Sequence, residues 1–229
     1  MQVYKQKELE NVLNGMASIL TYKDPKNKER DEVREFLQCA YGLFSSWKGK
    51  LNPPLTRTYD ADKFWPLFVY FLKECENGSW SQMARHESKI EKYKTQLFSS
   101  LEQLLSARAN LNKTIGIMES VTENSSPKKI AGLTPFILSG ILFASDEDTF
   151  MILDNPVLEY FDLKDYREAL SEYRNIIDIS RSYSKKFKLS MWYINKAYGI
   201  LSHNGELAVK KLCGNCRSIK SKNFVYSFG

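Results

Sequence analysis

Apolar residues recur every three or four positions through most of this 229-residue chain, and this spacing limits the fold more than any other feature. Such spacing collects apolar side chains on one face of an α-helix. The clearest example is the set Val33, Phe36, Leu37, Ala40, Tyr41, Phe44 and Trp47. Because no alternating strand pattern stands out, we predict an all-α protein, a multi-helix orthogonal bundle with an irregular C-terminal tail.

Turn-forming residues divide the predicted helices. The first helix runs from about Val3 to Leu20 and stops before Asp24-Pro25, and the second ends at the Gly- and Pro-containing segment 49–54. Asp60 is the predicted N-cap of the third helix. Further helices are predicted over residues 81–107, 111–122, 155–161, 164–182 and 187–202. We expect one helical domain over residues 1–203, with 1–50 as a candidate subdomain and 204–229 as a basic tail or linker.

The composition favours a soluble protein with a polyanionic partner. A hydrophobic content of 43% is enough for a buried core, and a net charge of +6 would attract DNA, RNA or a membrane surface. A basic protein without any polyanionic partner is the alternative. The N-terminus MQVYKQKELE lacks the apolar run of a signal peptide, and the apolar run 135–144 is far below the roughly 20 residues that cross a bilayer. We therefore expect a cytoplasmic protein without a membrane partner.

Metal and nucleophilic chemistry have weak support in the sequence. Of the four cysteines only Cys213 and Cys216 are close together, which is typical of a reduced intracellular protein. Their two-residue gap is one that zinc ribbons use, but a closed zinc site needs four ligands and only His203 is near. His86, the other histidine, lies in a charged run, and no GxxxxGK[ST] loop is present. We expect neither a metal nor a cofactor.

Residues 130–154 are the one stretch whose pattern suggests a specific binding mechanism, the binding of a phosphate by main-chain N–H groups. It is predicted to contain a short helix, a tight turn at Ala131-Gly132-Leu133 and an apolar helix that opens at Thr134-Pro135. The main-chain N–H groups of Gly132, Leu133 and Thr134, with the Thr134 hydroxyl, would bind a phosphate. Lys128 and Lys129 would add positive charge just before the turn. The alternative is a turn inside a helical bundle, where Gly132 permits a positive φ and Thr134 caps the next helix.

Residues 130–138, Ile-Ala-Gly-Leu-Thr-Pro-Phe-Ile-Leu, resemble the helix-hairpin-helix element of the endonuclease III-like DNA glycosylase superfamily. The resemblance implies that the turn binds a DNA backbone phosphate and that Asp154, which follows the hairpin, is catalytic. Thr134 stands where a second glycine is usual, and Phe136 stands where bifunctional members carry a catalytic lysine. Only a monofunctional glycosylase, in which Asp154 stabilises positive charge on the sugar or activates water, would remain. As an alternative, Asp154 is the N-cap of the helix that follows.

A wider resemblance covers roughly residues 60–197. The order of a Trp80 turn, a long helix that ends in Leu104-Leu105, the hairpin and the later Trp192 is similar to the helical module at the N-terminus of McrB-type restriction ATPases and GTPases. Residues 146–150, Asp-Glu-Asp-Thr-Phe, replace the Asn-Pro-x-x-Tyr of that module. The resemblance implies a DNA-recognition or docking module of an antiviral restriction system. It also implies a motor or nuclease partner, on another chain or further along the polypeptide.

A second basic cluster lies between the last two predicted helices. It consists of Arg181, Lys185, Lys186 and Lys188, accompanied by the aromatic residues Tyr183, Phe187 and Trp192. Cations beside aromatic rings suit backbone contacts and base stacking in nucleic-acid binding. They equally suit a solvated loop above a packed core. The basic residues of the tail would extend this surface.

Three functions from different classes follow from these patterns. The first is a non-enzymatic DNA-binding or adaptor module of a restriction-type defence system. The second is a monofunctional base-excision glycosylase that uses Asp154, which would place the protein in DNA repair. The third is a helical protein-interaction domain without nucleic-acid binding.

Overall fold

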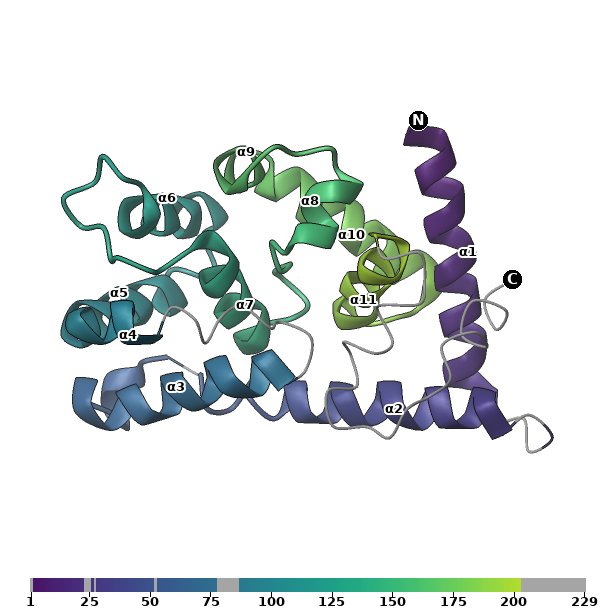
Figure 1. Cartoon of the computed structure of the whole chain (residues 1–229), viewed down its shortest axis with the longest axis horizontal. Helices are drawn as coiled ribbons and strands as arrows, with labels where there is room; N and C mark the ends of the chain where they lie inside the picture. Colours follow the sequence, from purple (N-terminus) through teal and green to yellow (C-terminus); the bar gives the residue numbers. More distant parts are fainter. Residues whose placement is uncertain (1, 23–25, 27, 52, 78–86, 203–229) are drawn as a thin grey trace.

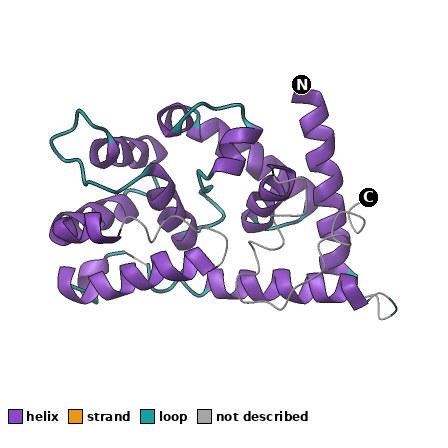
Figure 2. Ribbon diagram, in the orientation of Figure 1, coloured by secondary structure: helices purple, strands orange, loops and turns teal. Residues whose placement is uncertain are grey.

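The computed structural model describes residues 2–22, 26, 28–51, 53–77 and 87–202. In these residues every regular element is helical, which confirms the all-α prediction (Figures 1 and 2). The elements are α1 (Gln2–Thr21), α2 (Lys28–Ser45), η1 (Leu55–Arg57), α3 (Ala61–Asn77), α4 (Glu87–Ile90), η3 (Glu91–Tyr93), α5 (Lys94–Ser106), α6 (Leu111–Thr122), α7 (Pro135–Ser145), α8 (Asn155–Tyr160), α9 (Tyr166–Ser171), α10 (Tyr173–Phe187) and α11 (Met191–Ser202).

The predicted N-cap of the third helix, Asp60, is confirmed, and the structure adds a cap at Asn110 that the sequence analysis did not name. Asp60 accepts a hydrogen bond from the Lys63 amide at 2.8 Å at the start of α3. Asn110 accepts one from the Lys113 amide at 3.1 Å at the start of α6. Each side chain satisfies an amide that has no partner inside its helix, and this stabilises the helix by about 1 kcal/mol.

Two predicted helices are interrupted. The helix expected over residues 81–107 is divided by the 3-10 turn Glu91–Tyr93, and its residues 81–86 lie outside the described part. The helix expected over residues 164–182 is divided at Glu172, where φ of −92° and ψ of 3° leave helical geometry. Its second part, α10, continues to Phe187, and only residues 188–190 separate it from α11.

The arrangement places one apolar helix at the centre. Every residue of α7 except Phe136 is buried, because a helix that is apolar on all sides can lie only inside a core. α7 contacts α5, α6 and α9, whereas α11 packs against α1, α8 and α10. In Figure 1, α2 and α3 follow one another along one long edge, and α1 rises steeply from the end of α2.

Residues 150–153, on the connection between α7 and α8, have no regular secondary structure and lie in the core. All four residues are fully buried, so each of their main-chain polar groups needs a partner inside the protein. Ser139 of α7 accepts a hydrogen bond from the Leu153 amide at 2.9 Å, and the Tyr173 hydroxyl donates to the Met151 carbonyl at 2.5 Å. These two side chains position the segment that leads into Asp154.

Candidate functional site

The turn before α7 forms as predicted, but the helix expected immediately before it does not. Gly132 has a φ of 87°, in the left-handed region that glycine adopts at little cost. Thr134 caps α7 by accepting a hydrogen bond from the Ile137 amide at 3.3 Å. However, α6 ends at Thr122, and residues 123–134 form a turn-rich connection. The two helices are thus not joined by the short turn of a helix-hairpin-helix element.

Leu133 does not offer a phosphate donor, contrary to the prediction. Its amide donates to the Ile130 carbonyl at 3.1 Å, which closes the turn, and its side chain is buried. Ile130 in turn donates its amide to Val121 at 2.9 Å, so the connection is tied back to α6. Among the described residues, no hydrogen bond engages the amides of Gly132 and Thr134. The turn therefore offers fewer main-chain N–H donors to a phosphate than the sequence predicts.

Lys128 and Lys129 lie on the connection beside this turn. Lys128 is exposed, and its carbonyl accepts a hydrogen bond from the Gln96 side chain of α5 at 2.7 Å. Lys129 is half-buried and donates to the Asn124 side chain. Both lysines thus lie on the connection that leads into the glycine turn, and Lys128 is the more exposed of the two.

Asp154 caps α8, as the alternative reading of this residue predicts. Its carboxylate accepts hydrogen bonds from the Val157 amide at 3.2 Å and from the Asn195 side chain of α11 at 3.4 Å. Burial raises the pKa of Asp154 to about 6, although nearby Lys196 and the two hydrogen bonds favour the ionised form. Asn195 and Lys196 are themselves buried. The arrangement is a polar cluster that joins α8 to α11, with every contact of Asp154 made inside the fold.

Arg181, Lys185 and Lys186 of the second basic cluster lie on α10, whereas Lys188 follows the helix in a left-handed conformation. Lys186 forms an ion pair with Glu10 of α1 at 2.9 Å, so it serves the packing of α1 on α10. The Arg181 guanidinium donates to the Thr149 carbonyl at 3.2 Å and lies 3.9 Å from Asp178. Lys185 and Lys188 are exposed, and among the described residues neither has an ion pair or hydrogen bond from its side chain. Only these two keep the free ammonium group that the prediction requires.

The aromatic residues of this cluster do not form a stacking platform. Tyr183 is 7% exposed and Trp192 is 2% exposed, since both face the core. Phe187 is half-buried and packs against the core, with the Lys186 ammonium 5.3 Å from its ring. Base stacking by Tyr183 or Trp192, one of the two roles suggested by the sequence, is therefore excluded by their burial.

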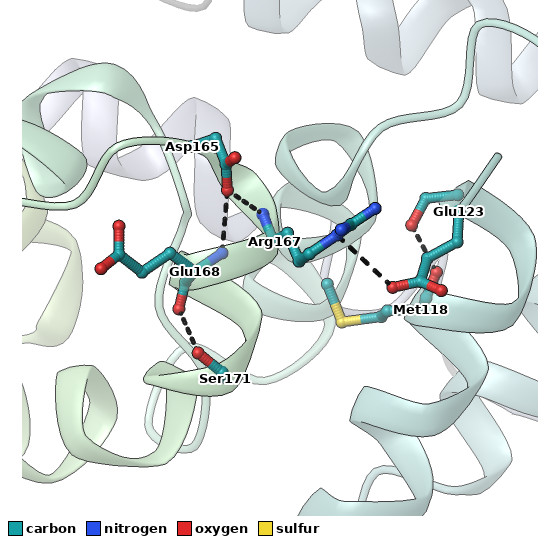
Figure 3. A network of polar contacts seen from close by, with 7 residues as sticks. Met118, Glu123, Asp165, Arg167, Glu168 and Ser171 are labelled. Atoms are coloured by element: carbon teal, nitrogen blue, oxygen red, sulfur yellow. Dashed lines mark hydrogen bonds and ion pairs between the residues drawn. The ribbon is translucent and has the colours of Figure 1, made fainter. Parts of the chain in front are cut away.

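The sequence patterns did not single out Arg167 and Arg174, two arginines whose side chains reach α6. Arg167 of α9 lies 3.9 Å from the Glu123 carboxylate at the end of α6 (Figure 3). Arg174 of α10 donates to the Asn112 side chain at the start of α6 at 3.0 Å. The two arginines lie on separate helices, because Glu172 interrupts the helical geometry between α9 and α10.

The remaining predictions concern metal ligands and membrane-spanning helices. Cys213, Cys216 and His203 lie outside the described residues. Within the described part of the chain, no cluster of three or more histidine, cysteine or acidic residues is arranged to hold a metal. None of the helices described there combines the length and the apolarity that a bilayer crossing requires.

Comparisons with known proteins identify no relative of this chain. The chain matches no protein-family model, and no curated protein or solved structure matches it significantly.

Proposed function

We propose that this protein is a nucleic-acid-binding adaptor module that contacts the sugar–phosphate backbone of duplex DNA and has no catalytic activity of its own. The observation that carries the proposal is the exposed pair Lys185 and Lys188 at the end of α10. Ammonium groups without an intramolecular partner gain more from a phosphate than those already paired, because no ion pair is given up.

The distribution of charge in the sequence supports this proposal. Residues 203–229, which follow α11, contain five lysines and arginines against one glutamate, so four of the six excess positive charges lie there. Residues 185–188 come shortly before α11, near that segment in sequence. Lys128, beside the Gly132 turn, is a further candidate contact. Backbone contacts of this kind are insensitive to sequence and supply most of the affinity in non-specific DNA binding.

The resemblance to McrB-type modules provides the biological context of the proposal. A module of that kind would bind DNA for a separate motor or nuclease in a restriction-type defence system. The chain has no P-loop motif of its own, which agrees with a division of labour between binding and nucleotide hydrolysis.

The glycosylase function is the less favoured candidate. Asp154 holds its carboxylate against the Val157 amide and Asn195, and this use as a cap accounts for its position without any reaction. Release of a free base from damaged duplex, lost in Asp154→Asn, would establish the glycosylase and replace the adaptor proposal.

The proposal is tested by titrating the full chain against a fluorescent duplex at several salt concentrations and following the anisotropy. Each phosphate contact contributes about 0.9 to the slope of log K against log salt. The double substitution Lys185→Gln and Lys188→Asn is expected to lower the slope by about 2, and asparagine suits the φ of 55° at position 188. Lys63→Gln, a cation 74% exposed on α3, is the control and should leave the slope unchanged. Wild-type protein that binds no duplex at low salt would refute the proposal.

A further inference from the structure

We infer that Tyr41, Glu147 and Ser190 form a proton-sensitive clasp, which holds α2 more tightly against the connection after α7 and the start of α11 when Glu147 carries a proton. We call these three residues the α2 clasp. The inference goes beyond the proposed function and does not depend on it. It assigns the docking of α2 as the part of the fold that responds to pH.

The α2 clasp joins three segments that are far apart in the sequence. The Tyr41 hydroxyl of α2 donates a hydrogen bond to Glu147 Oε1 at 2.5 Å, and Glu147 lies on the connection between α7 and α8. Ser190 comes directly before α11, and its hydroxyl lies beside both other side chains. The contacts of the clasp therefore depend on the docking of α2.

Aromatic rings next to the clasp provide further contacts between α2 and this region. The Tyr41 ring centroid lies 5.8 Å from that of Trp192 and 5.5 Å from that of Tyr193, and Phe44 lies 5.0 Å from Phe143 of α7. Within the described part of the chain, α2 packs more on α1 than on any other helix. The clasp thus belongs to a lesser contact of α2, and regions with fewer packing contacts open more readily than the core.

Two polar atoms of the clasp are buried without a hydrogen bond. Among the described residues, Glu147 Oε2 and Ser190 Oγ have no partner. An ionised carboxylate has about four acceptor positions, and the Tyr41 hydroxyl fills one of them. Burial of a charge with so little compensation is costly. A proton on Oε2 removes the charge and supplies a donor for the nearby Ser190 hydroxyl.

The groups around Glu147 act on its carboxyl in both directions. Burial raises the pKa of Glu147 above its ordinary value of 4.5, although the Tyr41 hydrogen bond opposes the rise. The Asp148 carboxylate next to it raises the pKa further, and the Lys48 ammonium, which follows α2, lowers it. On α11, burial and the charge of Glu147 raise the pKa of Tyr193 to about 12, so this phenol stays neutral while Glu147 titrates.

The sign of the pH effect follows from proton linkage. When α2 is docked, Glu147 binds a proton more tightly than when its carboxyl is in water, because burial raises its pKa. Docking should therefore be strongest below the ordinary pKa of 4.5 and should weaken as the pH rises through the raised pKa. Arg181 of α10, which reaches the same connection at the Thr149 carbonyl, stays charged over this range and contributes a constant field.

The test is hydrogen exchange of α2 in the full chain, followed by mass spectrometry at about pH 4 and about pH 8 and expressed as protection factors, which divide out the intrinsic exchange rate. A helix that undocks loses the packing that keeps its main-chain hydrogen bonds closed, so its amides exchange faster. Glu147→Gln is neutral at both pH values and should raise the protection of α2 severalfold over wild type at the higher pH. It should match the wild type at the lower pH.

The control is Glu91→Gln, which removes an exposed carboxylate on η3 and should leave the protection of α2 as in the wild type at both pH values. Asp154 also titrates in this range. The effect of Glu147 is therefore taken from the difference between the wild type and Glu147→Gln, in which Asp154 is the same. Circular dichroism confirms that each variant is folded.

Tyr41→Phe separates the clasp from simple ring packing. It keeps the ring against Trp192 and Tyr193 but removes the hydroxyl that donates to Glu147. A hydrogen bond to an ionised carboxylate is stronger than one to a neutral carboxyl. The protection of α2 should therefore fall more at the higher pH than at the lower one. An equal loss at both pH values would overturn the clasp, and so would equal protection of α2 in the wild type and Glu147→Gln at the higher pH.

Discussion

Replacing Asp154 by asparagine tests how the carboxyl group at the start of α8 is used. Burial raises the pKa of Asp154 from 3.8 to about 6 in the folded protein. The folded state therefore binds a proton to this group more tightly than the unfolded state does. The contribution of Asp154 to stability is full below about pH 4 and is lost as the pH rises to about 6.

The size of the effect follows from the shift in pKa. A change from 3.8 to about 6 is roughly two units, and at about 1.4 kcal/mol per unit it corresponds to about 3 kcal/mol. Asparagine cannot ionise, but its side-chain oxygen can still cap α8 at the Val157 amide. Relative to Asp154→Asn, the wild type should lose up to about 3 kcal/mol of unfolding free energy between about pH 4 and pH 7.

The assay is urea unfolding followed by circular dichroism at a series of pH values and constant ionic strength, with the difference between wild type and variant plotted against pH. Asp165→Asn is the matched control, since Asp165 caps α9 at the Arg167 and Glu168 amides, each at 2.9 Å (Figure 3). These main-chain hydrogen bonds lower the pKa of Asp165. Its difference plot should therefore have the opposite sign, with stability gained as the pH rises. A flat plot for Asp154, or one with the sign of Asp165, would show that burial does not raise the pKa of Asp154. A role for its carboxylate in contact with solvent would then have to be considered again.

Three further predictions concern the core segment and the turn. Ser139→Ala leaves the buried Leu153 amide without its acceptor and should lower the unfolding free energy by about 1–3 kcal/mol, whereas Ser182→Ala on the exposed side of α10 should change it little in the same urea titration. Gly132→Ala places a Cβ at a φ of 87° and should cost about 1–2 kcal/mol in thermal or urea unfolding; an unchanged stability would mean that the turn relaxes. Charge reversal at Lys128 and Lys129 should weaken duplex binding for every DNA sequence, and unchanged anisotropy curves would remove the turn from the interface.

Local chemistry made the caps and the turn predictable. Thr134 and Asp154 each precede an apolar helical pattern and a proline, and a cap depends on an amide only three residues away. Gly132 is predictable for the same reason, because a tight turn needs a residue that accepts a positive φ. Caps and tight turns depend on contacts between residues a few positions apart, so the local sequence is enough to predict them.

Which side chains are paired or buried depends on contacts between distant segments, and these contacts could not be predicted from the sequence. Lys185 and Lys186 are neighbours of the same charge, but a helix turns by 100° per residue and the position of α1 determines which of them is paired. The same holds for Tyr183 and Trp192, whose rings look equally suited to stacking and to a core. The burial of Asp154 also depends on α11, which lies some forty residues further along the chain.

The competition between core packing and ligand binding explains why the structure moves the nucleic-acid proposal from the turn to α10. At the turn, Leu133 uses its amide to close the loop and its side chain to fill the core, and Thr134 uses its hydroxyl oxygen to cap α7. The Leu133 amide, which closes the turn, is not available to a phosphate without a cost in stability. α10 buries only one face, so cations on its outer flank can bind a ligand with no loss of core contacts. A surface that folding leaves unused is therefore the better candidate for recognition, and on this chain that surface is the exposed end of α10 with Lys185 and Lys188.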